Sequence, residues 1–229
     1  MKKTAVIHQP DFIPYLGFFQ RLLSADVFVI LDDVQFLRRG WHHRDKIKTP
    51  NGEQWLSIGT VKTAQATNIN QIRLSNTNWR QEHLNILTQN YKKADFFHEI
   101  FPIIKGIYEQ NHLSLFDFNF NFLKILFTLF DINVEIEFSS TFDIHTTSNQ
   151  RIVDILNVVH ATHYLSGIGA RNYYDPKPYK QAGISVIWQA FEHPIYPQLY
   201  GQFIPYLSCI DILFNCGIIK SREILRSCK

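Results

Sequence analysis

Cysteine is scarce in this chain of 229 residues, and its placement is uneven. The sequence contains three cysteines, and all of them lie close to its C-terminal end, at Cys209, Cys216 and Cys228. An odd, clustered set of this kind does not match the paired framework of small secreted proteins. We therefore expect a protein of the reducing cytoplasm.

Strong charge of one sign is missing as well. The formal net charge is +3, because 23 Lys and Arg are set against 20 Asp and Glu. A general nucleic-acid binder usually carries a larger basic excess, so we expect no nucleic-acid partner. The local basic cluster consists of Arg38, Arg39, Arg44, Lys46 and Lys48. Such a cluster suits phosphate or another anion as well as RNA.

The sequence also lacks a long uninterrupted hydrophobic run. Its first apolar stretch is broken at His8 and Pro10, which predicts neither a signal peptide nor a membrane anchor. The apolar segment 113–131 carries Asp, Asn and Lys within its span. We interpret it as a buried amphipathic helix, because a membrane span needs about twenty mostly apolar residues. No membrane span is expected.

Aromatic residues, by contrast, are abundant. The sequence contains 19 Phe and 10 Tyr beside one Met, and 45% of its residues are hydrophobic. A chain of this length and composition can bury a large core, which we expect to be built from rings, Ile and Leu. Some tyrosines are expected to line a ligand cleft, since a phenol offers both a ring and a hydrogen bond.

Residues 5–33 form a compact strand, loop, helix and strand pattern, AVI, HQPDFIPYLG, FFQRLLSA and DVFVILDD. Similar strands follow near residues 134–140, 163–167 and 184–191, with a helix that starts near Thr147. This alternation predicts an α/β fold with a mostly parallel, open, Rossmann-like sheet. We expect residues 1–229 to form a single domain.

Two insertions interrupt this alternation. Pro50, Asn51 and Gly52 form a turn between two short segments, which predicts a hairpin that covers the sheet edge. Three helical patterns then form a helical insertion at about residues 79–131. Near the C-terminus we expect a helix that stops at Gly217 and a second, short helix capped by Ser221.

Polar residues follow the predicted strands, where open α/β sheets bind their ligands. His8 is a candidate general base after the first strand, and Asp33 after the second is a candidate to orient it. An alternative places Asp32 and Asp33 in ion pairs with Arg38, Arg39 or nearby lysines, and a third role for them is to hold Mg²⁺. The candidate substrate contacts in these two segments are Gln9, Asp11, Tyr15 and Asp32.

Further candidates come from later segments. Arg44 alternates with Lys46 and Lys48, which predicts a positive strip that could hold a phosphate, or else a solvated hairpin face. The segment SGIGARN adds Ser166 and Arg171 as substrate contacts, or forms only a tight turn, and it lacks the third glycine of the dinucleotide motif.

A loop rich in proline follows the last predicted strand. It contains His193, a second catalytic candidate, and Gln198, a candidate substrate contact. Cys209 would lie at a helix start, where it is either an acyl-accepting nucleophile paired with His193 or a buried structural cysteine. No Cys/His spacing predicts a zinc site, and we assign no metal ligands.

Four segments stand out as a set: HQPDFIPYLGFFQRLLSADVFVILDDVQF, WHHRDKIKTPNGEQWLSI, YLSGIGARNYY and FEHPIYPQLYGQFIPYLSCIDILFNCG. Together they resemble the WbqC-like protein family, and the resemblance runs from the first strand to the C-terminal helix. Position 43 departs from the more usual Trp-x-Asn-Arg pattern, while Arg44 matches it. The resemblance implies an enzyme of bacterial O-antigen or related surface polysaccharide biosynthesis.

The activity that this resemblance implies is transfer of an acyl or aminoacyl group to the amine of an amino sugar. His8 or His193 would deprotonate the amine, which attacks an activated or carrier-bound acyl donor. The expected partners are a nucleotide-linked amino sugar and an acyl or peptidyl carrier protein, with no resident cofactor. Two alternatives stay open: nucleotidyl transfer, and a non-catalytic sugar-binding protein of the same pathway.

Overall fold

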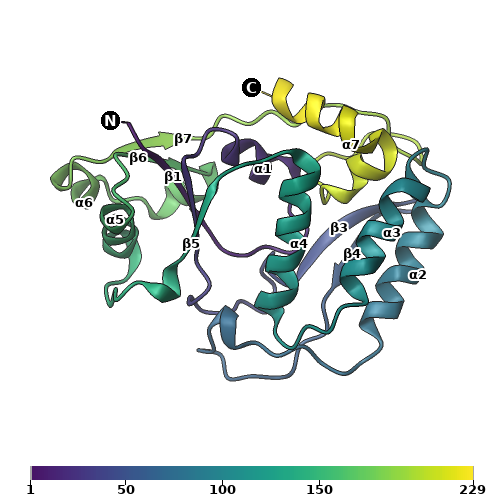
Figure 1. Ribbon diagram of the computed structural model, residues 1–229, viewed down its shortest axis with the longest axis horizontal. Coiled ribbons are helices and arrows are strands. Elements are labelled where there is room, and N and C mark those ends of the chain that lie inside the picture. Colours follow the sequence, from purple (N-terminus) through teal and green to yellow (C-terminus); the bar gives the residue numbers. More distant parts are fainter. Residues whose placement is uncertain (1, 229) are drawn as a thin grey trace.

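The computed structural model describes residues 2–228 and contains a five-stranded sheet (Figure 1). All neighbouring strands in it are parallel, and their order is β5-β2-β1-β6-β7. The strands are β1 (Thr4–His8), β2 (Val27–Ile30), β5 (Glu135–Phe138), β6 (His163–Ser166) and β7 (Ser185–Trp188). The predicted open α/β fold with a parallel sheet is confirmed.

Both faces of the sheet are buried, which explains why its central strands are continuous apolar runs. Alternate side chains point to opposite faces, so Val6 and Phe28 join one core cluster while Ala5 and Val27 join the other. The first face is covered by α1 (Leu16–Leu22), α4 (Leu115–Phe130) and α7 (Ile210–Ser227). The second face is covered by α5 (Ser148–Val158) and α6 (Pro176–Gln181), to the left of the strands in Figure 1.

The predicted hairpin forms a separate two-stranded sheet. Strands β3 (Arg44–Thr49) and β4 (Gly52–Ser57) pair in antiparallel register, with Thr49 opposite Gly52. Gly52 has a φ of 101°, a conformation that side chains with a Cβ rarely adopt, so the turn requires glycine at this position. The hairpin packs against α7.

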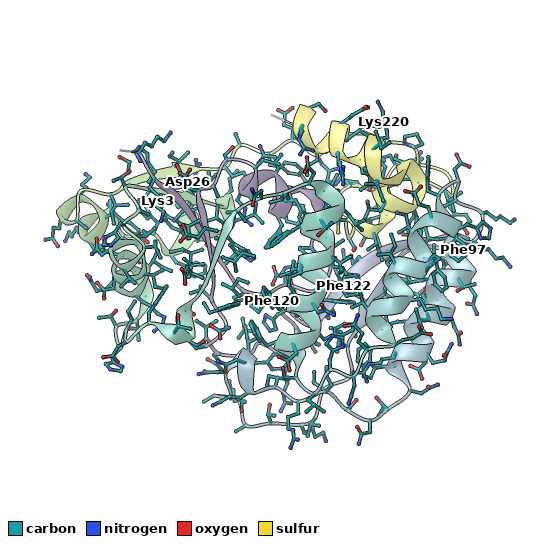
Figure 2. All side chains as sticks on the ribbon, in the orientation of Figure 1. Lys3, Asp26, Phe97, Phe120, Phe122 and Lys220 are labelled. Atoms are coloured by element: carbon teal, nitrogen blue, oxygen red, sulfur yellow. The ribbon has the colours of Figure 1, made fainter. Side chains whose placement is uncertain are left out.

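The helical segment between β4 and β5 contains α2 (Trp79–Tyr91), α3 (Phe97–Tyr108) and α4, preceded by the short 3-10 helix η1 (Ile69–Gln71). In Figure 1, α4 stands between the sheet and the α2–α3 pair. Figure 2 shows Phe120 and Phe122 on opposite sides of α4. The Phe120 ring lies 5.1 Å from the ring of Phe138 at the end of β5, and Phe122 packs on Tyr108 of α3. Aromatic rings therefore join this segment to the sheet.

The apolar segment that includes α4 is buried inside the fold, as predicted. Within residues 2–228, no helix combines the length and the apolar character that a bilayer crossing requires.

The C-terminal helix differs in part from its prediction. The helical backbone is broken at Gly217, whose φ of 71° and ψ of 177° are not helical, as the sequence indicates. Contrary to the prediction, Ser221 does not cap the helical half that follows this break. The hydroxyl of Ser221 is buried and donates to the carbonyl of Ile212 across the break, so this residue joins the two halves of α7.

The strand order places a topological switch point between β1 and β6. From β1 the chain continues through α1 on one face to β2, whereas from β6 it continues through the 3-10 helix η3 (Ile168–Tyr173) and α6 on the other face to β7. The two connections separate at the carboxyl ends of β1 and β6, which leaves room for a ligand there.

Candidate functional site

A pocket of about 660 Å³ lies at this switch point. Its walls come from the end of β1 and the loop after it, from α1, from the turn after β6, from the end of β7 and from the hairpin region. Its size falls within the range of small-molecule sites, and its lining mixes apolar surface with a few polar groups. We therefore treat it as the candidate active site.

The loop after β1 is held rigidly by contacts with distant parts of the chain. The side-chain amide of Asn119, which is fully buried on α4, donates to the carbonyls of Pro10 and His42 at 2.7 and 2.6 Å. The hydroxyl of Ser208 donates to the carbonyl of Ile13, which has a strained φ of 40°. Such fixation of the loop positions its side chains before any ligand binds.

His8, the last residue of β1, and Asp11, on the loop after it, form a pair. Nδ1 of His8 lies 3.1 Å from the carbonyl oxygen of Gln9 and 3.5 Å from Oδ2 of Asp11. Because a carbonyl oxygen can only accept, Nδ1 carries the proton, and Nε2 is left with its lone pair. The His8 side chain is 30% exposed and lines the pocket. The carbonyl of Gln9 therefore orients the imidazole, and the carboxyl group of Asp11 lies near enough to Nδ1 to stabilise an imidazolium.

The local environment shifts both groups. Burial and the positive charge of Arg21 lower the pKa of His8 to about 3, so the imidazole is neutral near pH 7. Burial raises the pKa of Asp11 to about 7, against the opposing effect of Arg21. Asp11 therefore changes its charge in the pH range in which general acid–base catalysis is most efficient.

A second buried carboxyl group, that of Asp45 on β3, also lines the pocket. Burial and the proximity of Asp11 raise its pKa well above the usual value, and its Oδ1 accepts a hydrogen bond from the backbone of Lys46. Within the described residues 2–228, no three His, Cys, Asp or Glu side chains converge in a way that could hold a metal ion.

Aromatic side chains form much of the remaining wall. Tyr15, Phe191 and Tyr206 line the pocket, with the Tyr15 ring 5.8 Å from the ring of Phe191 and 6.0 Å from that of Tyr206. At another part of the wall Trp41 is 50% exposed, and its ring lies 5.4 Å from that of Trp55. Rings with polar edges suit a ligand that has both flat apolar faces and hydroxyl groups.

Five of the residues singled out from the sequence meet in this pocket: His8, Gln9, Asp11, Tyr15 and Ser166. They lie at the carboxyl ends of two adjacent parallel strands or in the loop after the first of them, which explains why residues so distant in sequence lie together. The other six do not line it. They are Asp32, Asp33, Arg44, Arg171, His193 and Gln198.

Asp32 and Asp33 form structural contacts on the other side of β1. Asp33 accepts two hydrogen bonds from Arg151 of α5, at 2.8 and 2.7 Å. Asp32 is buried and accepts from Asn70 and from the backbone of Ser140. The ion pair expected as the alternative role thus exists for Asp33, but its partner is Arg151. These carboxylates connect β2 to the elements around it.

Replacing Asp33 with Asn is expected to lower the free energy of unfolding by roughly 2–3 kcal/mol, because Arg151 loses its partner in a partly buried position. Urea unfolding measures this loss. The matched control is Asp131→Asn, whose pair with Arg226 is exposed and should contribute less than about 1 kcal/mol. Equal effects of the two substitutions would contradict the structural role of Asp33.

His193 lies one layer behind the pocket wall. Its ring packs against those of Phe191 and Tyr206, at 5.8 and 5.1 Å, and Nδ1 lies 2.9 Å from the carbonyl of Pro194. Gln198 does not face the pocket either, because its side-chain amide donates a hydrogen bond to buried Asp211 at 2.8 Å. The loop that carries both residues therefore supports the wall from outside.

The basic strip on β3 is divided between different environments. The guanidinium of Arg44 lies 4.2 Å from the Trp55 ring centre, and Lys46 pairs with Glu53. Lys48 is fully buried, and its ammonium donates to Gln198. The three residues do not form one exposed surface, although they alternate as predicted.

Two other candidates, Arg171 and Cys209, lie outside the pocket because each packs against other parts of the chain. Arg171 on η3 stacks over Trp188, with its guanidinium 5.2 Å from the ring centre. Cys209 is 1% exposed, and burial raises the pKa of its thiol well above the usual value. This environment is typical of a structural cysteine and disfavours the thiolate that a nucleophile needs. All three cysteines are free.

Sequence reasoning missed Arg21, Trp41, Asp45, Tyr164 and Gln189, all of which line the pocket. Arg21 had a detectable signal, because it lies three and four residues after Phe18 and Gly17 on the buried face of a short helix. The others carried none, since their position depends on strand pairing and on the path of the loop before β3. Gln189 donates to the carbonyl of Gly17 at 2.7 Å and so joins β7 to α1.

The fold and the pocket define a doubly wound α/β protein with a pocket at the switch point of a parallel sheet. The chain belongs to the WbqC-like protein family, whose model matches residues 9–223. The chain is also similar to the uncharacterized protein Rv1507c of Mycobacterium tuberculosis, with 32% identity over 232 residues that cover 100% of both chains. No solved structure matches the chain at a significant level. Membership of this family suggests a role related to polysaccharides.

Proposed function

We propose that this protein transfers an acyl or aminoacyl group from an activated donor to the amine of an amino sugar used in bacterial surface polysaccharide synthesis. The observation that supports this most directly is the His8–Asp11 pair in a pocket at the switch point. An amine must lose a proton as it attacks a carbonyl carbon. The neutral imidazole of His8 has a free Nε2 that can accept this proton when an ionised Asp11 stabilises the imidazolium and so opposes the lowering of the His8 pKa by burial and Arg21.

The reaction requires a nitrogen–carbon bond to form and the bond between the acyl carbon and its leaving group to break. His8 takes the amine proton through Nε2 and returns it to the leaving sulfur or oxygen. Asp11, when ionised, stabilises the imidazolium that forms in between. Burial raises the pKa of Tyr15, so its hydroxyl keeps its proton and can donate to a substrate oxygen.

The aromatic wall and Ser166 support a sugar as the acceptor. A sugar ring presents flat apolar faces that fit against Tyr15 and Trp41, and hydroxyl groups that bond to polar side chains such as Gln9 and Ser166. A nucleotide-linked amino sugar is the acceptor that we favour, with a carrier-bound or otherwise activated acyl group as the donor.

The direct test is an assay for the amide product. Purified protein is incubated with nucleotide-linked amino sugars and with acyl-thioester or aminoacyl donors, and the products are identified by mass spectrometry. An amide that requires both substrates supports the proposal. Release of pyrophosphate from a nucleoside triphosphate without amide would instead support nucleotidyl transfer.

A non-catalytic sugar-binding role is the second alternative, and the aromatic wall of the pocket is the observation that favours it. Cells that carry a protein with His8 and His193 both replaced would then keep normal polysaccharide synthesis. Loss of synthesis with a folded double variant would reject the binding-only role.

A further inference from the structure

Arg21 is a buried cation without a counter-ion in the described part of the chain. It lies in the last turn of α1 and is 5% exposed. No Asp or Glu of residues 2–228 forms an ion pair with it, and its Nε has no hydrogen-bond partner. A buried charge is costly unless it is paired, so a folded protein rarely retains one without a function.

The groups around Arg21 do not neutralise it. The titratable groups of the pocket that interact electrostatically with it are His8, Asp11, Tyr15 and Tyr164. His8 and both tyrosines are neutral near pH 7, because burial lowers the pKa of the imidazole and raises those of the phenols. Asp11 has a pKa of about 7 and is only partly ionised. Arg21 therefore lacks a fully ionised partner in the pocket.

The turn after β6 makes room for the guanidinium. A Cβ atom on Gly167 would lie 2.9 Å from Nη1 of Arg21, closer than side chains approach one another. The φ of Gly167 is −71°, which any residue can adopt, so a larger residue here would meet the guanidinium of Arg21 and not a backbone restriction. Arg21 and Gly167 both line the pocket. The guanidinium therefore lies between α1 and this turn, at the switch point.

We propose that Arg21 forms an oxyanion subsite within the pocket and binds a phosphate or carboxylate group of the ligand. The identity of that ligand rests on the proposed function, in which the diphosphate of a nucleotide-linked amino sugar is the natural source of the anion. A guanidinium can donate two parallel hydrogen bonds to either group, which an ammonium cannot. The subsite would place the sugar amine close to His8, which lines the same pocket.

The test measures binding alone, so it does not depend on amide formation. Inorganic phosphate, a nucleoside diphosphate and acetate are titrated separately into the full chain at pH 7 and low salt, and affinity is measured by calorimetry. The wild type is expected to bind at least one of them. Arg21→Met should weaken that binding by about 10- to 100-fold, because a charge-assisted pair is lost. Arg21→Lys should recover only part of it.

Gly167→Ala provides a second variant that keeps Arg21. The added methyl group should push the flexible guanidinium away and weaken anion binding, while the backbone remains unstrained. Gly106→Ala is the matched control, because a Cβ at that position on α3 meets no atom within 4 Å. It should bind the anion as the wild type does.

The outcomes separate the two proposals. Binding of phosphate compounds assigns the subsite to a phosphate group, and binding of acetate alone assigns it to a carboxylate. Absence of binding by the wild type, or equal binding by a folded Arg21→Met protein, overturns the subsite and leaves the acyl-transfer assay unaffected. Anion binding without any amide product keeps the subsite and counts against acyl transfer.

Discussion

Replacing His8 with Gln is expected to lower kcat for amide formation by about 10²- to 10⁴-fold, the usual contribution of a general base. Glutamine keeps a polar group of similar length at the end of β1 but cannot take a proton from the attacking amine. KM for the amino sugar should change little, because the aromatic wall and Gln9 remain. Steady-state kinetics with detection of the amide product measures both quantities.

His193→Gln is the matched control for this substitution. Its ring packs behind Phe191 and Tyr206 and does not line the pocket, so the variant should keep a kcat close to that of the wild type. A large loss of kcat with His193→Gln, together with a small loss with His8→Gln, would transfer the role of base to His193. Circular dichroism of both variants confirms that they are folded.

Asp11→Asn is expected to reduce activity and to increase stability at the same time. The amide cannot stabilise the imidazolium that His8 becomes, so kcat should fall and its dependence on pH near 7 should disappear. The amide also removes a carboxyl group whose ionisation the folded protein disfavours. A gain in stability with a loss of activity is typical of residues retained for function.

The pH range of this stabilisation follows from the raised pKa of Asp11. In the unfolded chain the carboxyl ionises near pH 3.8, whereas in the folded protein it holds its proton to about pH 7. The wild type therefore loses stability as the pH rises through this interval, and above pH 7 the ionised carboxylate destabilises it. Asp11→Asn should be more stable than the wild type by roughly 2–4 kcal/mol above pH 8, with little difference near pH 4.

Urea unfolding at pH 4 and at pH 8.5 measures this difference for the two proteins. Asp26→Asn serves as a control carboxyl variant, because the Oδ2 of Asp26 accepts a hydrogen bond from the backbone of Thr4 outside the pocket. Its stability should not rise with pH relative to the wild type. A free energy of unfolding that is the same for Asp11→Asn and wild type at pH 8.5 would show that Asp11 is well hydrated.

Much of the fold could be predicted from local patterns. The apolar runs that became β1 and β2 indicate strands buried on both faces, and α2 begins at Trp79, where the predicted helical insertion begins. The break at Gly217 was also visible, because only glycine readily adopts its φ of 71°. The exact edges of α3 were less visible, since Pro102 lies inside the helix that starts at Phe97.

The site residues that could be predicted are those at the end of a strand or in the loop directly after it. His8, Asp11 and Ser166 belong to the carboxyl ends of β1 and β6 or the loop after β1, so the parallel sheet alone brings them together. Asp33 also follows the end of a strand, yet its carboxylate accepts a hydrogen bond from Arg151, which lies 118 residues away in the sequence. No spacing rule indicates such a partner.

The sequence by itself determined the unit of β1, α1 and β2 and the polar groups that follow each strand, because both depend on residues that are close together in the chain. The pairing of β1 with β6 and of β2 with β5 joins segments that are far apart in the chain. The tertiary structure decided which of those groups are free to act. Whether a carboxylate is neutralised, as Asp33 is by Arg151, or is desolvated beside an unpaired Arg21, as Asp11 is, depends on neighbours brought close by folding. Charge interactions act through space and not along the chain, so their balance is set only when the distant segments pack.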